Sequence, residues 1–133
     1  MQRKTVVDNE FMTLWYYPES KIIHHQFHKY IYGEEFRKGL NAGVEEMRKQ
    51  GAQKWLSDDR NNMALPIEDV EWAKTDWFPR TQKAGWKFWA LVQPEKAIGQ
   101  LNMQQFTNTY SKLGITVNVF SDPDEAMKWL ESQ

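Results

Sequence analysis

Apolar and polar side chains alternate in the first part of the chain, which is typical of β-strands. Residues 10–17 and 21–31 are rich in aromatic and β-branched side chains. Pro18, Glu19 and Ser20 lie between the two runs and predict a turn, so we expect an antiparallel hairpin. Residues 1–9 lack periodicity, and we expect them to form a flexible segment.

The apolar spacing changes to the 3.6-residue period of a helix after Gly33. One apolar stripe in this region is formed by Phe36, Leu40, Val44 and Met47. Acidic residues begin the predicted helix, basic residues end it, and Gly51 follows in the position of a C-terminal cap. Gly39 and Gly43 are four residues apart on one face, where the helix can approach a sheet closely.

The remaining pattern predicts three further strands, each followed by a helix. The strands are expected at 53–57, 86–92 and 115–120, and the helices at about 67–84, 95–113 and 123–130. Pro79 is expected to kink the first of these helices because it lacks a backbone donor. Asp122, Pro123 and Glu125 combine an N-cap, a proline at the first helical position and an acidic third position, and so predict the start of the last helix.

The element order β-β-α-β-α-β-α-β-α predicts an α/β fold in one domain, residues 10–133. Repeated βα units favour parallel neighbours joined by right-handed crossovers, to which the hairpin adds an antiparallel strand. We therefore expect a mixed, mostly parallel five-stranded sheet. The last strand is apolar on one face and wetter on the other, which favours a singly wound βα superhelix over a doubly wound sandwich.

Composition narrows the possible functions. The chain has 133 residues, 41% of them hydrophobic and 14% aromatic, which is enough for one hydrophobic core. A net charge of −1 argues against general nucleic-acid binding. The lack of cysteine excludes disulfides, cysteine metal sites and thiol catalysis. Neither a membrane span nor the apolar run of a signal peptide is visible, so we expect a bacterial-type cytoplasmic protein.

Two stretches resemble the SpoIIAA-like branch of the STAS superfamily. They are Lys54-Trp55-Leu56-Ser57-Asp58-Asp59-Arg60-Asn61, and Trp77-Phe78-Pro79-Arg80 with Gly85 before a strand; the resemblance covers roughly Phe11 to Leu130. It implies a βα superhelical domain related to anti-sigma-factor antagonists and, more distantly, to the Sec14 lipid-binding fold. Those antagonists carry a phosphorylatable serine where this chain has no Ser or Thr between Asp58 and Lys74. The phosphorylation switch of the antagonists is therefore not expected here.

Four candidate binding residues follow the strand predicted at 53–57: Asp58, Asp59, Arg60 and Asn61. Ligands of open α/β sheets bind outside the carboxyl ends of the parallel strands. Arg60 is therefore a candidate to hold an anionic group while a carboxylate orients a hydroxyl. The alternative is an internal ion pair between aspartate and arginine that fixes the loop.

Three further candidates, Trp77, Phe78 and Arg80, lie on the helix predicted at 67–84. Asp76 and Arg80 are four residues apart, which predicts an ion pair within the helix. Trp77 and Phe78 either belong to the aromatic core or form the wall of a pocket that Pro79 helps to open.

His24, His25 and His28 suggest a metal cluster, but strand geometry argues against one. On a strand, His24 and His28 share a face at a separation of about 13 Å, and His25 points to the opposite face. We predict no metal site, and expect hydrogen-bonded or exposed histidines on the wetter face of the sheet. The sequence contains no hydrolase, phosphate-binding or dinucleotide-binding motif, so it predicts no catalytic residue and no cofactor.

The aromatic side chains of the hairpin region need a cover: Trp15, Tyr16, Tyr17, Phe27, Tyr30 and Tyr32. The N-terminal segment, an apolar ligand or a second subunit, in a homodimer through the hairpin, would shield them from water.

Three functional hypotheses follow. The first is a non-enzymatic, STAS-type regulatory or protein-interaction domain that presents residues 58–66 and the following helix to a partner protein. The second is a small carrier or sensor that binds an apolar or anionic molecule between helix and sheet. Its wall would be Trp77, Phe78 and Trp89, and its anchor Arg60 or Arg80. An enzyme that uses Asp58 and Arg60 is the third.

Overall fold

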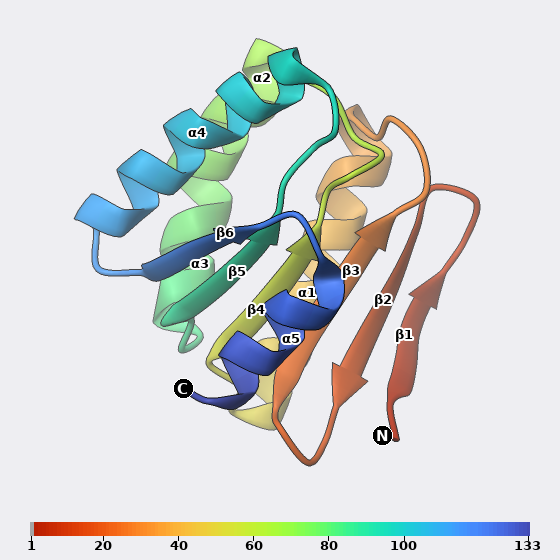
Figure 1. Ribbon diagram of the computed structural model, residues 1–133, viewed down its shortest axis with the longest axis vertical. Coiled ribbons are helices and arrows are strands. Elements are labelled where there is room, and N and C mark those ends of the chain that lie inside the picture. The colour runs from red at the N-terminus through yellow and green to blue at the C-terminus, as the bar shows by residue number, and fades with distance from the viewer. Residues whose placement is uncertain (1) are drawn as a thin grey trace.

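A six-stranded mixed sheet organises the computed structural model, which describes residues 2–133 (Figure 1). Its strands, in chain order, are β1 (Lys4–Asp8), β2 (Met12–Tyr17), β3 (Ile22–Phe27), β4 (Lys54–Asp58), β5 (Phe88–Val92) and β6 (Thr116–Phe120). Strands β1, β2 and β3 pair antiparallel, and β3 to β6 pair parallel. The order of the strands in the sheet is their order in the chain. The predicted α/β class with a mixed sheet is confirmed.

The sheet has one strand more than the sequence predicts. Residues 1–9 were expected to be a flexible segment, but Lys4–Asp8 pair with β2 as the edge strand β1. The pairing register shifts between Thr5 and Val7, and Val6 and Val7 pack against the core. This shift and the charged ends of the strand disturb the alternation of apolar and polar residues. The periodicity signal of β1 is correspondingly weak.

The three crossovers between parallel strands all lie on one face of the sheet, as the singly wound prediction requires. They contain α1 (Gly33–Gln50), then α2 (Ile67–Trp72), η1 (Ala73–Trp77) and α3 (Phe78–Lys83), and finally α4 (Ala97–Lys112). The last helix, α5 (Pro123–Glu131), lies on the opposite face (Figure 1). Its start is capped as predicted, because the Asp122 side chain accepts a hydrogen bond from the Asp124 backbone N–H at 3.0 Å. None of the helices in residues 2–133 is long and apolar enough to cross a membrane.

The predicted kink near Pro79 takes the form of a π-helical segment. The helix expected at 67–84 runs as α2, η1 and α3, with Pro79 in the first turn of α3. A proline inside a helix lacks an N–H and its ring crowds the preceding turn. The wider π turn directly before it relieves this conflict without ending the helix.

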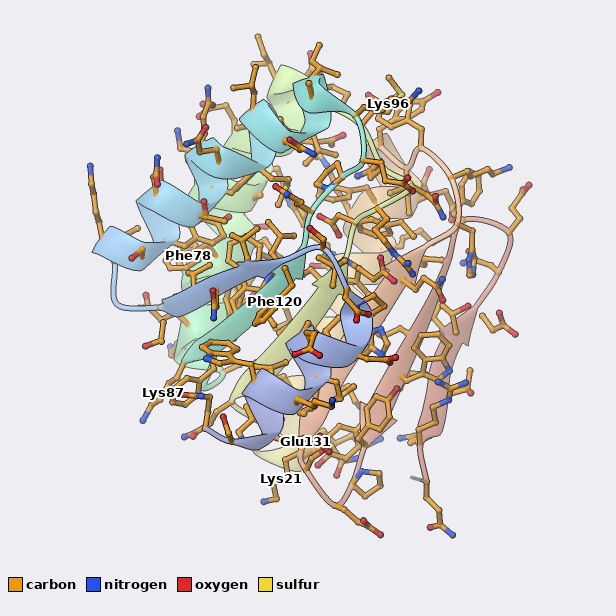
Figure 2. All side chains as sticks on the ribbon, in the orientation of Figure 1. Lys21, Phe78, Lys87, Lys96, Phe120 and Glu131 are labelled. Atoms are coloured by element: carbon orange, nitrogen blue, oxygen red, sulfur yellow. The ribbon has the colours of Figure 1, made fainter. Side chains whose placement is uncertain are left out.

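Helix α1 lies close to the sheet at its two glycines, as their spacing predicts. A Cβ atom at Gly39 would collide with the Met12 side chain, and one at Gly43 with the ring of Trp55. The larger core fills the space between the sheet and α1 to α4, and a smaller core lies under α5. Figure 2 shows Phe120 of β6 next to α5, where its ring contacts Trp129 at 6.0 Å between centroids.

The aromatic side chains of the hairpin region are largely covered by the chain itself. Tyr16, Tyr17 and Phe27 are buried, whereas Tyr30 and Tyr32 are exposed. Strand β1 also pairs with the outer edge of β2, so that edge of the hairpin is occupied within one chain. A homodimer through the hairpin stays a prediction, but few aromatic rings in this region remain exposed to solvent.

Candidate functional site

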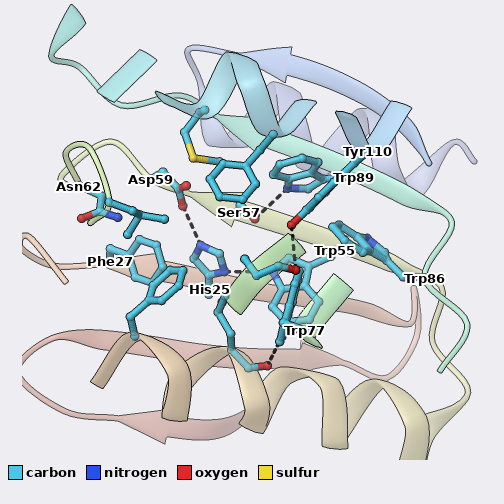
Figure 3. A pocket seen from close by; sticks show the side chains of 16 residues that line it. His25, Phe27, Trp55, Ser57, Asp59, Asn62, Trp77, Trp86, Trp89 and Tyr110 are labelled. Atoms are coloured by element: carbon cyan, nitrogen blue, oxygen red, sulfur yellow. Dashed lines mark hydrogen bonds and ion pairs between the residues drawn. The ribbon is translucent and has the colours of Figure 1, made fainter. Parts of the chain in front are cut away.

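A cavity of about 50 Å³ lies between the sheet and the helices α1, η1 and α4 (Figure 3). Its wall is mainly aromatic, and includes Phe27, Phe36, Trp55, Trp77, Trp86, Trp89, Phe106 and Tyr110. Four polar side chains also line it: His25, Ser57, Asp59 and Asn62. Since one water needs roughly 10–15 Å³ of such space, the cavity has room for about three or four waters, or for a ligand of a few heavy atoms.

Strand pairing places the polar side chains of the cavity. His25 on β3 is the register partner of Ser57 on β4, and Trp55 on β4 is the partner of Trp89 on β5. Side chains two apart on a strand share a face, so Trp55 and Ser57 both point to the helices. Asp59 directly follows β4, at the carboxyl end where open α/β sheets usually bind ligands.

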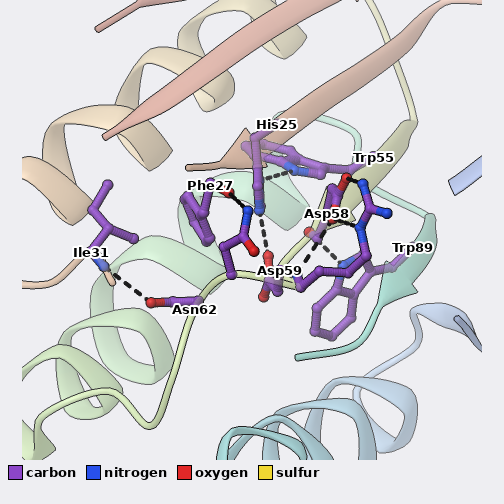
Figure 4. A network of polar contacts seen from close by, with 11 residues as sticks. His25, Phe27, Ile31, Trp55, Asp58, Asp59, Asn62 and Trp89 are labelled. Atoms are coloured by element: carbon purple, nitrogen blue, oxygen red, sulfur yellow. Dashed lines mark hydrogen bonds and ion pairs between the residues drawn. The ribbon is translucent and has the colours of Figure 1, made fainter. Parts of the chain in front are cut away.

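The ring of His25 is held by hydrogen bonds at both nitrogens (Figure 4). The indole N–H of Trp55 lies 3.0 Å from Nδ1, and Asp59 Oδ1 lies 2.7 Å from Nε2. Because an indole N–H can only donate, Nδ1 must accept, and the ring proton on Nε2 donates to Asp59. The side chains of His25 and Asp59 are only 4% and 5% exposed. The histidine is thus fixed as one neutral tautomer, with neither nitrogen free to accept a proton from a substrate.

Three polar atoms of the cavity lining keep unused hydrogen-bonding capacity within residues 2–133. Ser57 Oγ accepts from the Trp89 indole N–H at 2.9 Å, which leaves its own proton to donate. Asn62 Oδ1 accepts from the Ile31 backbone N–H at 3.1 Å, and its amide group donates to no described residue. Asp59 bonds His25 through Oδ1, so Oδ2 stays available as an acceptor. A ligand group that both donates and accepts, such as a hydroxyl, matches this set.

The structure separates Asp58 from Asp59, although they are adjacent in sequence. Asp58 points to the opposite face of the sheet and bonds Arg60 twice, with Nε and Nη2 at 2.9 and 2.8 Å from its oxygens (Figure 4). The hydrogen bond with Asp58 raises the pKa of Arg60, and the negative charges of Asp58, Glu95 and Asp122 raise it further. Asp58 and Arg60 thus form the internal ion pair that was the alternative to a binding site. The nearby negative charges do not favour binding of a further anion at Arg60. Anion binding by Arg60 stays a prediction.

The other candidates from the sequence occupy different places. Asn61 donates to the Phe27 carbonyl at 3.3 Å. Trp77 lines the cavity and donates to the Leu40 carbonyl at 3.0 Å. Phe78 stacks on Tyr110 but does not itself line the cavity. Arg80 is exposed on the helix and bonds Asp76 at 3.2 Å, which confirms the predicted ion pair. Asp59 and Trp77 therefore meet at the cavity, together with Trp89, and the remaining candidates do not.

Sequence reasoning missed His25, Ser57 and Asn62 as lining residues. As predicted, the His25 side chain points to the face of the sheet opposite to that of His24 and His28. The expected position on the wetter face of the sheet is wrong for His25, because the alternation along β3 puts it on the face of Ile23 and Phe27, which are both buried. A polar side chain on an otherwise apolar face was therefore the available signal. Within residues 2–133, no group of three or more His, Asp or Glu side chains is placed to hold a metal ion.

His24 lies on the opposite face of the sheet, in a second polar cluster. Its Nδ1 is 3.0 Å from the Tyr17 hydroxyl, which itself accepts a hydrogen bond from Arg3 at 3.4 Å. The other ring nitrogen, Nε2, is buried without a hydrogen-bond partner in the described chain. Burial lowers the pKa of His24 to about 3, and electrostatic interactions with His25, Arg3 and Arg60 contribute in the same direction. Asp58 opposes them.

This lowered pKa predicts that the protein loses stability in weak acid. The unfolded chain protonates His24 below about pH 6.5, whereas the folded chain does so only near pH 3. The stabilising effect is therefore complete above pH 6.5 and decreases as the pH falls towards 3. Between pH 7 and pH 5, His24 is expected to lower the free energy of unfolding by about 2 kcal/mol.

Urea unfolding at pH 5, 6 and 7 measures this effect. His24→Asn removes the titrating ring and is expected to flatten the pH dependence by the same amount. His28→Asn is the matched control, because it makes the same chemical change at an exposed histidine, and the two pH profiles are compared directly. Parallel pH profiles for the wild type and His24→Asn would contradict the prediction.

No family model, curated protein or solved structure matches this chain at a significant level. The resemblance to the SpoIIAA-like branch therefore rests on the residues quoted above. The candidate site is defined by geometry alone, as an aromatic cavity with a polar end at His25 and Asp59.

Proposed function

We propose that this domain is a non-enzymatic binding module, a carrier or sensor that holds a small, mainly apolar molecule in the cavity above the sheet. The cavity itself is the observation that supports this function most strongly. Aromatic side chains surround it, and Ser57, Asp59 and Asn62 offer hydrogen bonds among them. Small-molecule sites typically combine an apolar wall with a few placed polar groups.

The charge at the polar end favours a neutral ligand over an anionic one. The Asp59 carboxylate lines the cavity, and no lysine or arginine does. A buried anion next to this carboxylate would meet repulsion without compensation. The ligand anchor is thus a hydroxyl-like group at Ser57 and Asp59, in place of the Arg60 or Arg80 anchor expected from the sequence.

The size of the cavity limits the ligand. A volume of about 50 Å³ suits a few heavy atoms. Helix α4 contributes Met103 and Phe106 to the wall. Methionine side chains are flexible and adapt to irregular spaces, so a longer ligand requires Met103 to change rotamer.

Nuclear magnetic resonance of the tryptophan indole N–H groups tests the proposal with xenon and 1-butanol as probes. Both probes are expected to shift the signals of Trp55 and Trp89, whose indoles line the cavity. Trp129, which belongs to α5 on the other face of the sheet, should not shift. Ser57→Ala is expected to weaken 1-butanol binding about tenfold and leave xenon binding unchanged, because it removes one hydrogen bond.

Ser121→Ala is the matched control, since it makes the same chemical change at an exposed position outside the cavity lining. Unchanged indole signals at saturating concentrations of both probes would refute the binding module. Equal weakening by Ser57→Ala and Ser121→Ala would refute the placement of the hydroxyl group.

A STAS-type interaction domain is the second candidate. The sequential parallel strands with all crossovers on one face support it, as does the exposed apolar surface after β4. There Met63 and Ile67 are 42% and 78% exposed, next to the loop that the sequence assigns to a partner protein. Ile67→Glu distinguishes the two candidates, because it would weaken partner binding without changing the cavity.

A further inference from the structure

The two edges of the sheet differ in how they are protected against pairing with another strand. At one edge, β1 begins with Lys4, ends with Asp8 and has an irregular register between Thr5 and Val7. Charges and irregularities of this kind discourage edge pairing. At the other edge, β6 pairs regularly with β5 over its five residues and contains neither charge nor proline. The β6 edge is therefore the one open to a further strand.

The surface next to β6 is nearly free of charge. In a chain with 26% charged residues, the segment Ala97–Ser121 contains a single charged side chain, Lys112. This segment includes all of α4 and β6. A groove of about 540 Å³ runs between α4 and the ends of β5 and β6, and every residue that lines it is uncharged. Leu101 and Val119 in this groove are 65% and 44% exposed. Depletion of charge is a mark of protein interfaces.

We propose that this surface binds a second copy of the chain, with the two β6 strands antiparallel across a two-fold axis. Both sheets then join into one. Helix α4 covers the same face of the sheet as the β6 side chains Val117 and Val119. The α4 helices of the two copies therefore lie on one face of the joined sheet, on either side of the axis.

The backbone of β6 determines the register. The Thr116 N–H bonds the Lys87 carbonyl at 2.9 Å, and the Phe120 carbonyl accepts from the Gln93 N–H at 3.1 Å. Both residues thus point their backbone groups towards β5. By alternation, Val117 and Val119 point theirs outward. Antiparallel pairing centred on Asn118 places Val117 opposite Val119 of the second copy, and each pair exchanges two hydrogen bonds.

A second copy fits this edge better than a different protein. Only two residues of β6 offer outward backbone groups, so most of the contact area has to come from α4. A two-fold axis brings the same surface of both copies together. An uncharged surface meets itself without like-charge repulsion, whereas interfaces between different proteins commonly use complementary charges. In the single chain, the Val119 N–H donates a hydrogen bond to Asn118 Oδ1 at 3.0 Å. In the dimer, the Val117 carbonyl of the second copy would accept this hydrogen bond instead.

Sedimentation velocity of the full chain between about 1 and 100 μM tests the dimer. The wild type is expected to dimerise in this range, and Val119→Lys to weaken the dimer about 100-fold or more, because it introduces like charges near the axis. Thr5→Lys is the matched control on the other edge strand and should dimerise like the wild type. A monomeric wild type throughout, or equal affinities for the wild type and Val119→Lys, would overturn the proposal.

Disulfide trapping tests the register independently of stability. The chain has no cysteine, so a single introduced cysteine can form a disulfide only between two molecules. Opposed residues on antiparallel strands have Cβ atoms about 4.5–5.5 Å apart, which is close enough for a disulfide after small adjustments. Asn118→Cys is expected to give covalent dimers much faster than Thr5→Cys under mild oxidation. Equal rates would overturn the proposed register, whatever the outcome of the ligand experiments.

Discussion

His25→Ala is expected to lower the free energy of unfolding by about 3–5 kcal/mol. The substitution leaves the Asp59 carboxylate buried without the ring N–H that it accepts from at 2.7 Å. It also removes the acceptor of the Trp55 indole N–H and enlarges the cavity. Urea unfolding at pH 7, followed by circular dichroism, measures the loss.

Two comparisons distinguish the buried network from a general effect of losing a histidine. His28→Ala removes an exposed ring that contacts the Thr13 hydroxyl at 2.7 Å, and is expected to cost about 1 kcal/mol or less. The double variant His25→Leu with Asp59→Leu should be more stable than His25→Leu alone, because it removes the unpaired carboxylate as well. An equal loss for His28→Ala and His25→Ala, or a double variant less stable than His25→Leu, would show that the buried network is not the cause.

The second large effect is expected at Gly43. Gly43→Ala is expected to lower the free energy of unfolding by about 2–3 kcal/mol, because the new methyl group collides with the ring of Trp55. That ring is rigid and fully buried, and its indole N–H is bonded to His25, so it can move aside only by straining this hydrogen bond. The same substitution should shift or broaden the Trp55 indole signal.

Gly39→Ala is the matched control, four residues earlier on the same face of α1. There the methyl group meets the end of the Met12 side chain, which can change rotamer. Alanine also favours the helix over glycine by up to about 1 kcal/mol, so Gly39→Ala should be close to neutral. Thermal and urea unfolding of both variants provide the comparison. Equal losses at the two glycines would show that the rigidity of Trp55 is not the cause.

The elements of the fold with strong periodicity could be predicted from the sequence. The helix over Gly33–Gln50 has a continuous apolar stripe with two glycines towards the sheet, and short runs of apolar, aromatic or alternating residues identified β2 to β6. Strand β1 was missed because it is short and its register is irregular. Edge strands of this kind are defined by the neighbour that they pair with, and local sequence carries little of that information.

The candidate site could be predicted only in part. Local alternation gives the face on which His25 lies, and it separates Asp58 from Asp59 at the end of β4. The contact between His25 and Asp59 depends on the register of β3 against β4. That register is set by the crossover through α1, and no motif in the sequence reports it. Arg60 and Arg80 were proposed as alternative anchors, but both are instead paired with aspartates away from the cavity.

Because the strands follow one another in the sheet as they do in the chain, the sheet can form while the protein is being synthesised. Each strand pairs with its neighbours in the chain, so each new strand leaves the ribosome when its partner is already available. The sheet can therefore grow from β1 towards β6, and α5 covers the second face last.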